Sequence, residues 1–305
     1  GVAGQIGKKV LVLDHAPVLG EKIRISGGGR CNFTNLHSSP ANFLSLNPHF
    51  VKSALARYPA AEFIKLIKSY RIAYHEKHQG QLFCDDSAKQ VVEMLMSECA
   101  RGDVTIRHPV AIESIAQEGN QWLINTNAGV EKSKSVVMAT GGLPVPAIGA
   151  TAYSLDIAKQ FGLNVIEPRP ALVPLSFTAE TFSGLNELAG LSVPIGINSG
   201  SKGARYGACH FNEDVLITHK GLSGPAILQA SSYWVEGEPI QIDWLKNFDQ
   251  SGALRFDEVF NDDRHRLKLT ETILASVLPQ RLAKAFADQG NLSGRKWVEI
   301  SKKDR

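Results

Sequence analysis

The stretch "VLVLDHAPVLGEKIRISGGGRCNFTN", residues 10–35, joins a short apolar run to a polar, glycine-rich segment. The apolar run at residues 10–13 contains β-branched valines and ends at Asp14, which predicts a buried strand of a parallel sheet. Dinucleotide-binding folds use an acid in this place to hold ribose hydroxyls. The alternative is a simple strand followed by a helix-capping aspartate, and these residues alone favour neither interpretation.

Asp14 lies closer to the start of the sequence than the acid of a complete βαβ unit would. In a complete βαβ unit the acid follows the glycine-rich phosphate turn by roughly 20 residues, and only thirteen residues precede Asp14. The opening residues resemble the end of a helix. We therefore expect the first strand and its G-x-G-x-x-G turn to lie upstream of Gly1.

The glycine-rich segment has the composition of a cofactor-binding loop. The glycines at positions 27–29 carry no Cβ, so their backbone N–H groups can approach an anionic ligand closely. Lys22 and Arg30 can neutralise a pyrophosphate or a reduced flavin, and Asn32 offers an amide to ring carbonyls or hydroxyls. The alternative is a flexible surface loop, which the combination "GGGRCN" disfavours.

The pattern after this loop predicts a mixed fold. Apolar spacing predicts helices at residues 59–70 and 91–100. From residue 104 the runs "VTIR", "VAIESIAQE" and "QWLINTN" predict three antiparallel strands, and "SVVMAT" predicts a strand that returns to the parallel sheet before "GG". Such a β-meander is typical of flavoproteins with two dinucleotide-binding folds and disfavours a plain NAD dehydrogenase.

Composition narrows the class of protein. The net charge of +3 over 305 residues and the scattered basic residues predict neither a nucleic-acid partner nor a membrane surface. No stretch approaches the ~20 apolar residues of a membrane span. The cysteines are far apart and form no C-x-x-C pair, so we expect free thiols in a reducing cytoplasm. The pair His75 and His78 lacks an acidic partner, and no metal site is expected.

Five motifs resemble, in order, one bacterial flavoprotein family that comprises YhiN-like proteins and BaiN-type reductases, which are NAD(P)/FAD-dependent oxidoreductases. The resemblance covers essentially the whole chain. The motifs are "VLVLDHA", "GEKIRISGGGRCNFTN", "VVMATGG", "GATAYSLDIAKQFG" and "LITHKGLSGPAIL".

The resemblance implies an α/β architecture in three parts. An FAD-binding, doubly wound, Rossmann-like domain with a β-meander would span residues 1–168. An inserted β-rich domain would span residues 169–245, and a small helical subdomain residues 246–305. The family's closing FAD-binding segment has no counterpart before Arg305, so we expect part of the FAD site to lie outside this sequence.

The resemblance also implies roles for single residues. Asp14 would bind the adenosine ribose, and Val110 would contact adenine through its backbone, although it also fits a plain strand residue. Thr140, Gly141 and Gly142 would close over the cofactor, although they also fit an ordinary glycine turn. The residues implied to line the flavin and pyrophosphate are Lys22, Ser26, Gly27, Gly28, Gly29, Arg30, Cys31 and Asn32.

Two further residues each have two possible roles. His219 in "THKGLSGPA" could protonate a substrate carbon while a flavin delivers hydride, or it could lie in a structural turn. Cys31 could be redox-active beside the flavin, or it could serve packing, since no partner cysteine is near in sequence.

The function predicted from these features is an FAD-dependent oxidoreductase. It would move a hydride to or from a small unsaturated or carbonyl-conjugated molecule, with FAD performing the redox chemistry. NAD(P)H would bind transiently as donor, or another protein would supply electrons. The alternatives are a flavin-binding scaffold and an RNA-modification flavoprotein without NAD(P)H-driven activity of its own.

Overall fold

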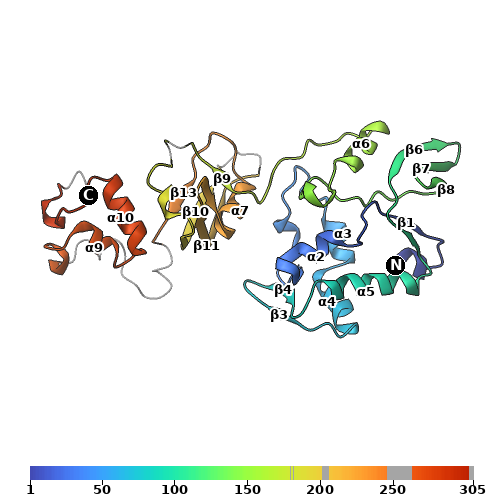
Figure 1. Cartoon of the computed structure of the whole chain (residues 1–305), viewed down its shortest axis with the longest axis horizontal. Helices are drawn as coiled ribbons and strands as arrows, with labels where there is room; N and C mark the ends of the chain where they lie inside the picture. Colours follow the sequence, from blue (N-terminus) through green and yellow to red (C-terminus); the bar gives the residue numbers. More distant parts are fainter. Residues whose placement is uncertain (179, 181, 201–205, 246–262, 302–305) are drawn as a thin grey trace. The chain divides into compact units, whose positions relative to one another are not determined.

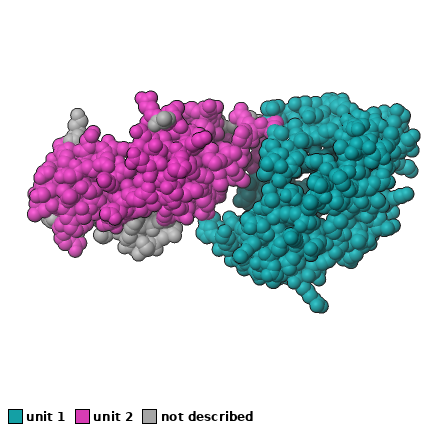
Figure 2. Space-filling model, viewed as in Figure 1, with its two compact units in different colours: residues 1–43, 47–167 teal, residues 44–46, 168–305 magenta. Residues whose placement is uncertain are grey.

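The computed structural model (Figure 1) describes residues 1–178, 180, 182–200, 206–245 and 263–301. The chain forms two compact units, which Figure 2 distinguishes by colour. Unit 1 contains Gly1–Phe43 and Asn47–Glu167, and unit 2 contains Leu44–Leu46 and Pro168–Arg305.

Unit 1 contains a parallel strand pair, as the apolar run predicts. Strand β1 (Leu11–Leu13) pairs in parallel with β5 (Thr105–Arg107). The short helix α1 (Val2–Gln5) packs against α5 (Lys89–Arg101), which leads into β5. Their contact is close, because a Cβ on Gly4 would lie 2.1 Å from the carbonyl oxygen of Gly102.

A second layer of unit 1 carries the glycine-rich segment. Helix α2 (Glu21–Ile25) runs into the 3-10 turn η1 (Ser26–Gly29) and then into β2 (Asn32–Asn35). Strands β2, β4 (Gln81–Cys84) and β3 (Tyr74–Glu76) form an antiparallel sheet in that order. The turn η2 (Pro40–Asn42), α3 (Lys52–Arg57) and α4 (Ala60–Ser69) connect β2 to β3. The core beneath includes Cys31, Ile67, Cys84, Val91 and Met94.

Burial of Cys84 gives unit 1 a dependence on alkaline pH. Desolvation, with a smaller contribution from Cys31, raises the pKa of the Cys84 thiol from 9.0 to about 11. Between these values the unfolded thiol ionises while the native thiol stays protonated, so stability is lost as the pH rises through this window. We expect the urea midpoint to fall between about pH 9 and 11. The fall should be shallower in Cys84→Ala and unchanged in Cys99→Ala; an equal slope in all three proteins would contradict this assignment.

The meander is confirmed, but its strands differ from those expected. It consists of β6 (Ile112–Glu118), β7 (Gln121–Thr126) and β8 (Gly129–Ser133). The run "VTIR" instead forms β5, in the parallel pair. The run "SVVMAT" forms no strand, because no strand in the described part of the chain hydrogen-bonds to it. After η3 (Pro146–Ile148), helix α6 (Tyr153–Gln160) packs on the meander through Ile157.

Unit 2 is built on an antiparallel sheet in the order β13-β10-β11-β12-β9. The helices in its described residues are α7 (Pro225–Ser231), α9 (Thr270–Leu274) and α10 (Gln280–Gln289), and the 3-10 turns there are η4 (Asn186–Leu188), η6 (Asp263–His265) and η7 (Trp297–Glu299). The strands are β9 (Leu175–Ser176), β10 (Ser192–Ser199), β11 (Cys209–Ile217), β12 (Gly221–Ser223) and β13 (Gln241–Asp243).

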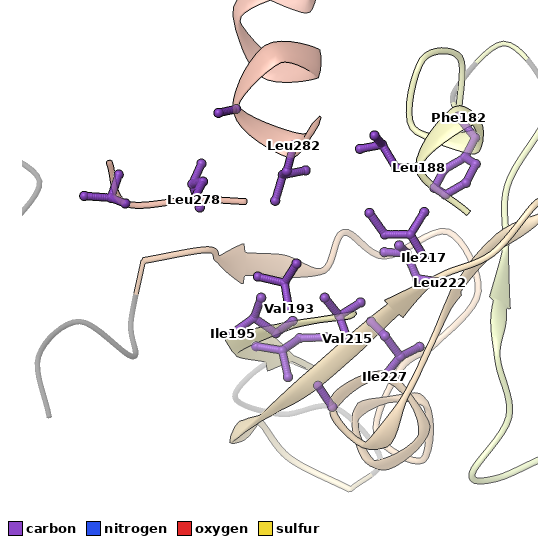
Figure 3. Close-up of a cluster of buried hydrophobic side chains, with 14 of the residues drawn as sticks. Phe182, Leu188, Val193, Ile195, Val215, Ile217, Leu222, Ile227, Leu278 and Leu282 are labelled. Carbon is purple, nitrogen blue, oxygen red and sulfur yellow. The ribbon is translucent and has the colours of Figure 1, made fainter. Parts of the chain in front are cut away.

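One apolar core joins the sheet of unit 2 to its C-terminal helices. Figure 3 shows Val193, Ile195 and Ile217 of the sheet gathered in one cluster with Leu278 and Leu282. Trp297 belongs to the same cluster. The expected separation into domains 169–245 and 246–305 stays a prediction, and residues 246–262 of it lie outside the described residues.

Candidate cofactor-binding site

The structure brings Asp14 and Val110 together at the end of β1. The backbone N–H of Val110 donates to the carbonyl oxygen of Asp14 at 2.8 Å, and the N–H of Asp14 donates to the carbonyl oxygen of Arg107 at 3.2 Å. The Val110 side chain is buried, and its N–H already has a partner. A backbone contact from Val110 to an adenine would therefore use its carbonyl oxygen as acceptor.

The Asp14 carboxylate is positioned with one oxygen left open. Its Oδ1 accepts the N–H of Ala16 at 2.8 Å, which fixes the chain as it leaves β1. Its Oδ2 has no hydrogen-bond partner among the residues that the structure describes. The side chain is 36% exposed. A carboxylate held in this way can accept a hydrogen bond from a ribose hydroxyl.

Residues 136–149 pass beside the same end of β1. Val136 and Met138 pack in one cluster with Leu13 of β1. Further along, a Cβ on Gly149 would lie 2.5 Å from Nε2 of His15, so this loop closes against the residue that follows Asp14. Thr140, Gly141 and Gly142 therefore leave the core from a segment that packs on β1.

The turn at residues 140–142 is open on one side. Gly141 has a φ of 73°, and no heavy atom lies within 4 Å of the position of an added Cβ. Its carbonyl oxygen accepts the hydroxyl of Ser154 at 3.1 Å, which ties the turn to α6. The turn is held from one side and leaves its other side free for a ligand.

The glycine-rich turn packs tightly at one glycine and is open at the next. Gly27, Gly28 and Gly29 all have positive φ, of 58°, 66° and 87°. A Cβ on Gly27 would lie 2.7 Å from the backbone nitrogen of Asn32 and 2.8 Å from Cε1 of Phe83. At Gly28 no heavy atom lies within 4 Å of that position. Gly27 therefore serves packing, whereas Gly28 faces space that a cofactor can use.

Backbone hydrogen bonds hold the turn in place from below. The carbonyl oxygens of Gly29 and Arg30 accept the N–H groups of Ala88 and Cys84 at 2.8 and 2.9 Å. The hydroxyl of Ser26 donates to the carbonyl oxygen of Ile23 at 2.7 Å. Cys31 is buried in the core beside Cys84, which supports packing as its role.

The turn is flanked by cations that no carboxylate neutralises. Lys22 and Arg30 are exposed, and neither forms an ion pair with any described residue. Arg24 is held differently, since its Nε donates to the carbonyl oxygen of Leu19 at 2.9 Å. Open space beside Gly28, two free cations and a hydroxyl acceptor at Asp14 suit the pyrophosphate and ribose of FAD. The residues present therefore fit this cofactor.

His219 lies in the other compact unit. It is exposed in the turn between β11 and β12. The N–H and the hydroxyl of Thr218 both donate to the carbonyl oxygen of Gly221, at 2.8 and 2.9 Å, which closes this turn tightly. Its role in protonating a substrate stays a prediction.

Sequence reasoning missed three residues that shape the site. Phe83 supports the glycine turn, His15 meets Gly149, and Ser154 holds Gly141. Only His15, directly after the strand-ending acid, stands where a local signal could have pointed to it. The contacts of Phe83 and Ser154 join segments far apart in sequence.

Two other kinds of site are not found in the described ranges. None of the helices there has the length and apolar character needed to cross a membrane. No three histidine, cysteine, aspartate or glutamate side chains gather there as a metal site would require. His75 instead contacts Asp85 at 2.7 Å and stacks on Phe83.

Comparison with known proteins gives two similar relatives over the whole chain. The sequence is 42% identical over 306 residues to the ribosomal RNA dihydrouridine synthase of Escherichia coli (strain K12), covering 100% of this chain and 74% of the relative. It is 41% identical over 304 residues to the protein of the same name from Haemophilus influenzae, covering 98% and 73%.

A third relative is more distant. The sequence is 22% identical over 286 residues to the 3-dehydro-bile acid delta(4,6)-reductase of Clostridium scindens, covering 90% of this chain and 67% of the relative. The name of this relative describes a reductase, as the motif resemblance implies.

The expectation that nucleic acid is not a partner is wrong. It is overturned by the two relatives above 40% identity, whose names describe action on ribosomal RNA. The error arose because it rested on the net charge of the whole chain, and a small net charge can hide a strongly basic segment.

The family of this chain is shown by a family sequence pattern that matches most of its length, and also by the relatives. The pattern described as "HI0933-like protein Rossmann domain" matches residues 1–290. This range includes β1, the glycine turn and the meander, and it agrees with the α/β fold observed. The chain therefore belongs to the HI0933-like family of FAD-binding, oxidoreductase-type Rossmann proteins.

Proposed function

We propose that this protein is an FAD-dependent reductase that converts uridine in ribosomal RNA to dihydrouridine. The observation that carries the proposal is the identity above 40%, across essentially the whole chain, to two proteins named ribosomal RNA dihydrouridine synthase. The open glycine turn and the Asp14 carboxylate support the cofactor.

The chemistry of uracil suits the reaction class predicted from the sequence. Its C5=C6 double bond is conjugated with the C4 carbonyl, so it is a carbonyl-conjugated alkene. Reduction adds a hydride at C6 and a proton at C5. FAD, when bound and reduced, supplies the hydride. The substrate is then a polynucleotide rather than the small molecule expected from the sequence.

The residues of this chain supply binding and electrostatics. Asp14 would accept a hydrogen bond from the adenosine ribose, and the turn at residues 26–29 leaves room for the cofactor beside Gly28. Lys22 and Arg30 would place positive charge near the pyrophosphate and the flavin. His219 is proposed to deliver the proton to C5. NAD(P)H is proposed as the source of electrons, and the cytoplasm as the location.

The test uses ribosomal RNA that lacks the modification. RNA from a strain deleted for this protein is incubated anaerobically with the purified full-length protein, FAD and NADPH. We expect uridine at one or a few positions to gain two hydrogen atoms by mass spectrometry of nuclease fragments. Omission of FAD or NADPH should prevent the gain. If the flavin-loaded protein leaves the RNA unchanged with NADPH and also with dithionite, the proposal fails.

A second candidate is reduction of a small carbonyl-conjugated molecule. The relative named 3-dehydro-bile acid delta(4,6)-reductase favours it, although at 22% identity. NADPH oxidation stimulated by small enones, with none stimulated by ribosomal RNA, would favour this candidate over the first.

A further inference from the structure

Positive charge in this chain is concentrated in one segment. Residues 22–61 contain no aspartate or glutamate, and they contain Lys22, Arg24, Arg30, Lys52 and Arg57. Their formal charge of +5 exceeds the +3 of the whole chain, so the remaining residues are slightly acidic in sum. We call residues 22–43 and 47–61, which belong to unit 1, the acid-free segment.

The cations of the acid-free segment are available to a partner. Lys22, Arg30, Lys52 and Arg57 are exposed, and none is paired with a carboxylate within the described ranges. Cations elsewhere in unit 1 do form such pairs, for example Arg101 with Glu98 at 2.7 Å. Cations that are not paired with carboxylates can attract the phosphates of a polyanion.

Aromatic rings of the same segment are exposed to solvent. Phe50 is 77% exposed, Tyr58 53% and Phe43 45%. Phe33, by contrast, packs against the core of unit 1. Proteins that bind single-stranded nucleic acids combine exposed aromatic rings with cations. Each base can stack on a ring while the phosphates contact the cations.

The backbone that presents Phe50 is held by hydrogen bonds. The N–H of Phe50 donates to the carbonyl oxygen of Asn47 at 3.1 Å, and the N–H of Lys52 donates to that of His49 at 3.1 Å. Helix α3 follows directly and carries Lys52 and Arg57. The ring and the two cations therefore stand on a defined turn and helix, which lowers the entropic cost of binding.

We propose that the acid-free segment is the surface on which this protein binds an unpaired stretch of RNA. This inference rests on the proposed function for the identity of the partner. Polar side chains also lie between the aromatic positions, among them Asn47, His49 and Ser53. Such side chains can hydrogen-bond base edges and 2′-hydroxyls. The same segment includes the turn proposed to face the flavin.

The experiment measures RNA binding of the full-length, FAD-loaded protein by fluorescence anisotropy. The probe is a labelled, uridine-rich, single-stranded 20-nucleotide RNA, and salt is varied. The variants are Lys52→Glu with Arg57→Glu, and Phe50→Ala, which avoid the residues assigned to the cofactor. The matched control is Lys132→Glu with Lys134→Glu, which reverses two exposed lysines of the meander region.

The two variants should weaken binding in different ways. Charge reversal at positions 52 and 57 should weaken binding at least ~10-fold and lower the slope of log K against log salt by about 1.4, for two lost phosphate contacts. Phe50→Ala should weaken binding roughly 5- to 100-fold with the slope unchanged, as for one lost stacking partner. The control should change the affinity less than about twofold.

These binding measurements test the RNA-binding surface whether or not the protein forms dihydrouridine. RNA binding equal in all variants, or lost equally in the control, overturns the inference even if dihydrouridine is formed. Binding of phosphatidylserine vesicles that the Phe50 variant abolishes, with RNA binding intact, also overturns it. Loss of RNA binding in the two variants supports the inference, even where the wild-type protein forms no dihydrouridine and the proposed function therefore fails.

Discussion

Replacement of Gly28 by leucine is expected to abolish tight FAD binding without unfolding the protein. No heavy atom lies within 4 Å of the position of a Cβ on Gly28, so the first carbon of the new side chain enters open space. The side chain would fill the space that we assign to the cofactor. The φ of 66° costs a leucine about 1–2 kcal/mol, a modest part of the stability of an ordinary domain.

Gly119 provides the matched control for this change. It has a φ of 57°, no heavy atom lies within 4 Å of its Cβ position, and it lies in the turn between β6 and β7. We expect Gly28→Leu and Gly119→Leu to lower the urea midpoint by similar amounts. FAD affinity, measured by flavin fluorescence, should fall at least ~100-fold, about 3 kcal/mol, in Gly28→Leu alone.

Comparing the Gly28→Leu and Gly119→Leu variants shows whether the glycine turn lines the cofactor or has only a structural role. If Gly28→Leu binds FAD as tightly as the wild-type protein, the glycine turn does not line the cofactor. If both variants lose FAD together, the loss follows from general destabilisation and the assignment of Gly28 is wrong.

The sequence predicted the elements whose signals are local. The apolar run before Asp14 forms β1, and the helix expected at residues 59–70 is α4, Ala60–Ser69. Both have a simple periodicity within a few residues. The meander was predicted as a type of structure because its turns carry glycine and asparagine.

Pairing between distant strands could not be predicted in this way. Strand β5 pairs with β1 across more than 90 residues, and nothing inside "VTIR" distinguishes a parallel partner from an antiparallel one. The third meander strand, β8, carries Glu131 and Lys132 and lacks an apolar face. Residues 136–140 have an apolar pattern, but a strand also needs a hydrogen-bonding neighbour.

The site shows the same division. The sequence indicated Asp14 and the glycine turn, because an acid after a strand and consecutive glycines are uncommon local patterns. It could not show that Gly27 packs on Phe83 while Gly28 is open, since that depends on β4. The distribution of charged residues can be recognised in the sequence. The expectation about nucleic acid used only the net charge of the whole chain, which conceals the acid-free segment, and it was wrong.

The "GLSGP" motif of unit 2 shows how a family signature can have a steric origin. A Cβ on Gly221 would lie 2.0 Å from the carbonyl oxygen of Leu175, on the neighbouring strand β9. A Cβ on Gly224 would lie 2.7 Å from the carbonyl oxygen of Asp214 and from the nitrogen of Leu216, on β11. Both glycines are required where β12 passes between its neighbours, which favours a structural role for this motif.

Gly221→Ala is therefore expected to be the most destabilising small substitution in unit 2. The added methyl group would overlap backbone atoms of β9, which cannot rotate away as a side chain can. Overpacking usually costs 1–3 kcal/mol, and we expect about 3 kcal/mol or more here because a hydrogen-bonded strand must shift. That loss corresponds to a fall in Tm of ~10 °C for a unit of this size.

Tryptophan fluorescence can report this loss, because three of the four tryptophans, Trp234, Trp244 and Trp297, belong to unit 2. The control is Gly237→Ala, at a φ of 90° with no heavy atom within 4 Å of the Cβ position, which tests backbone strain without overlap. Its expected cost is about 1–2 kcal/mol. Equal unfolding midpoints for the two variants would show that β9 yields at little cost. The glycine in the motif would then need a reason other than packing, such as contact with a ligand or substrate near His219.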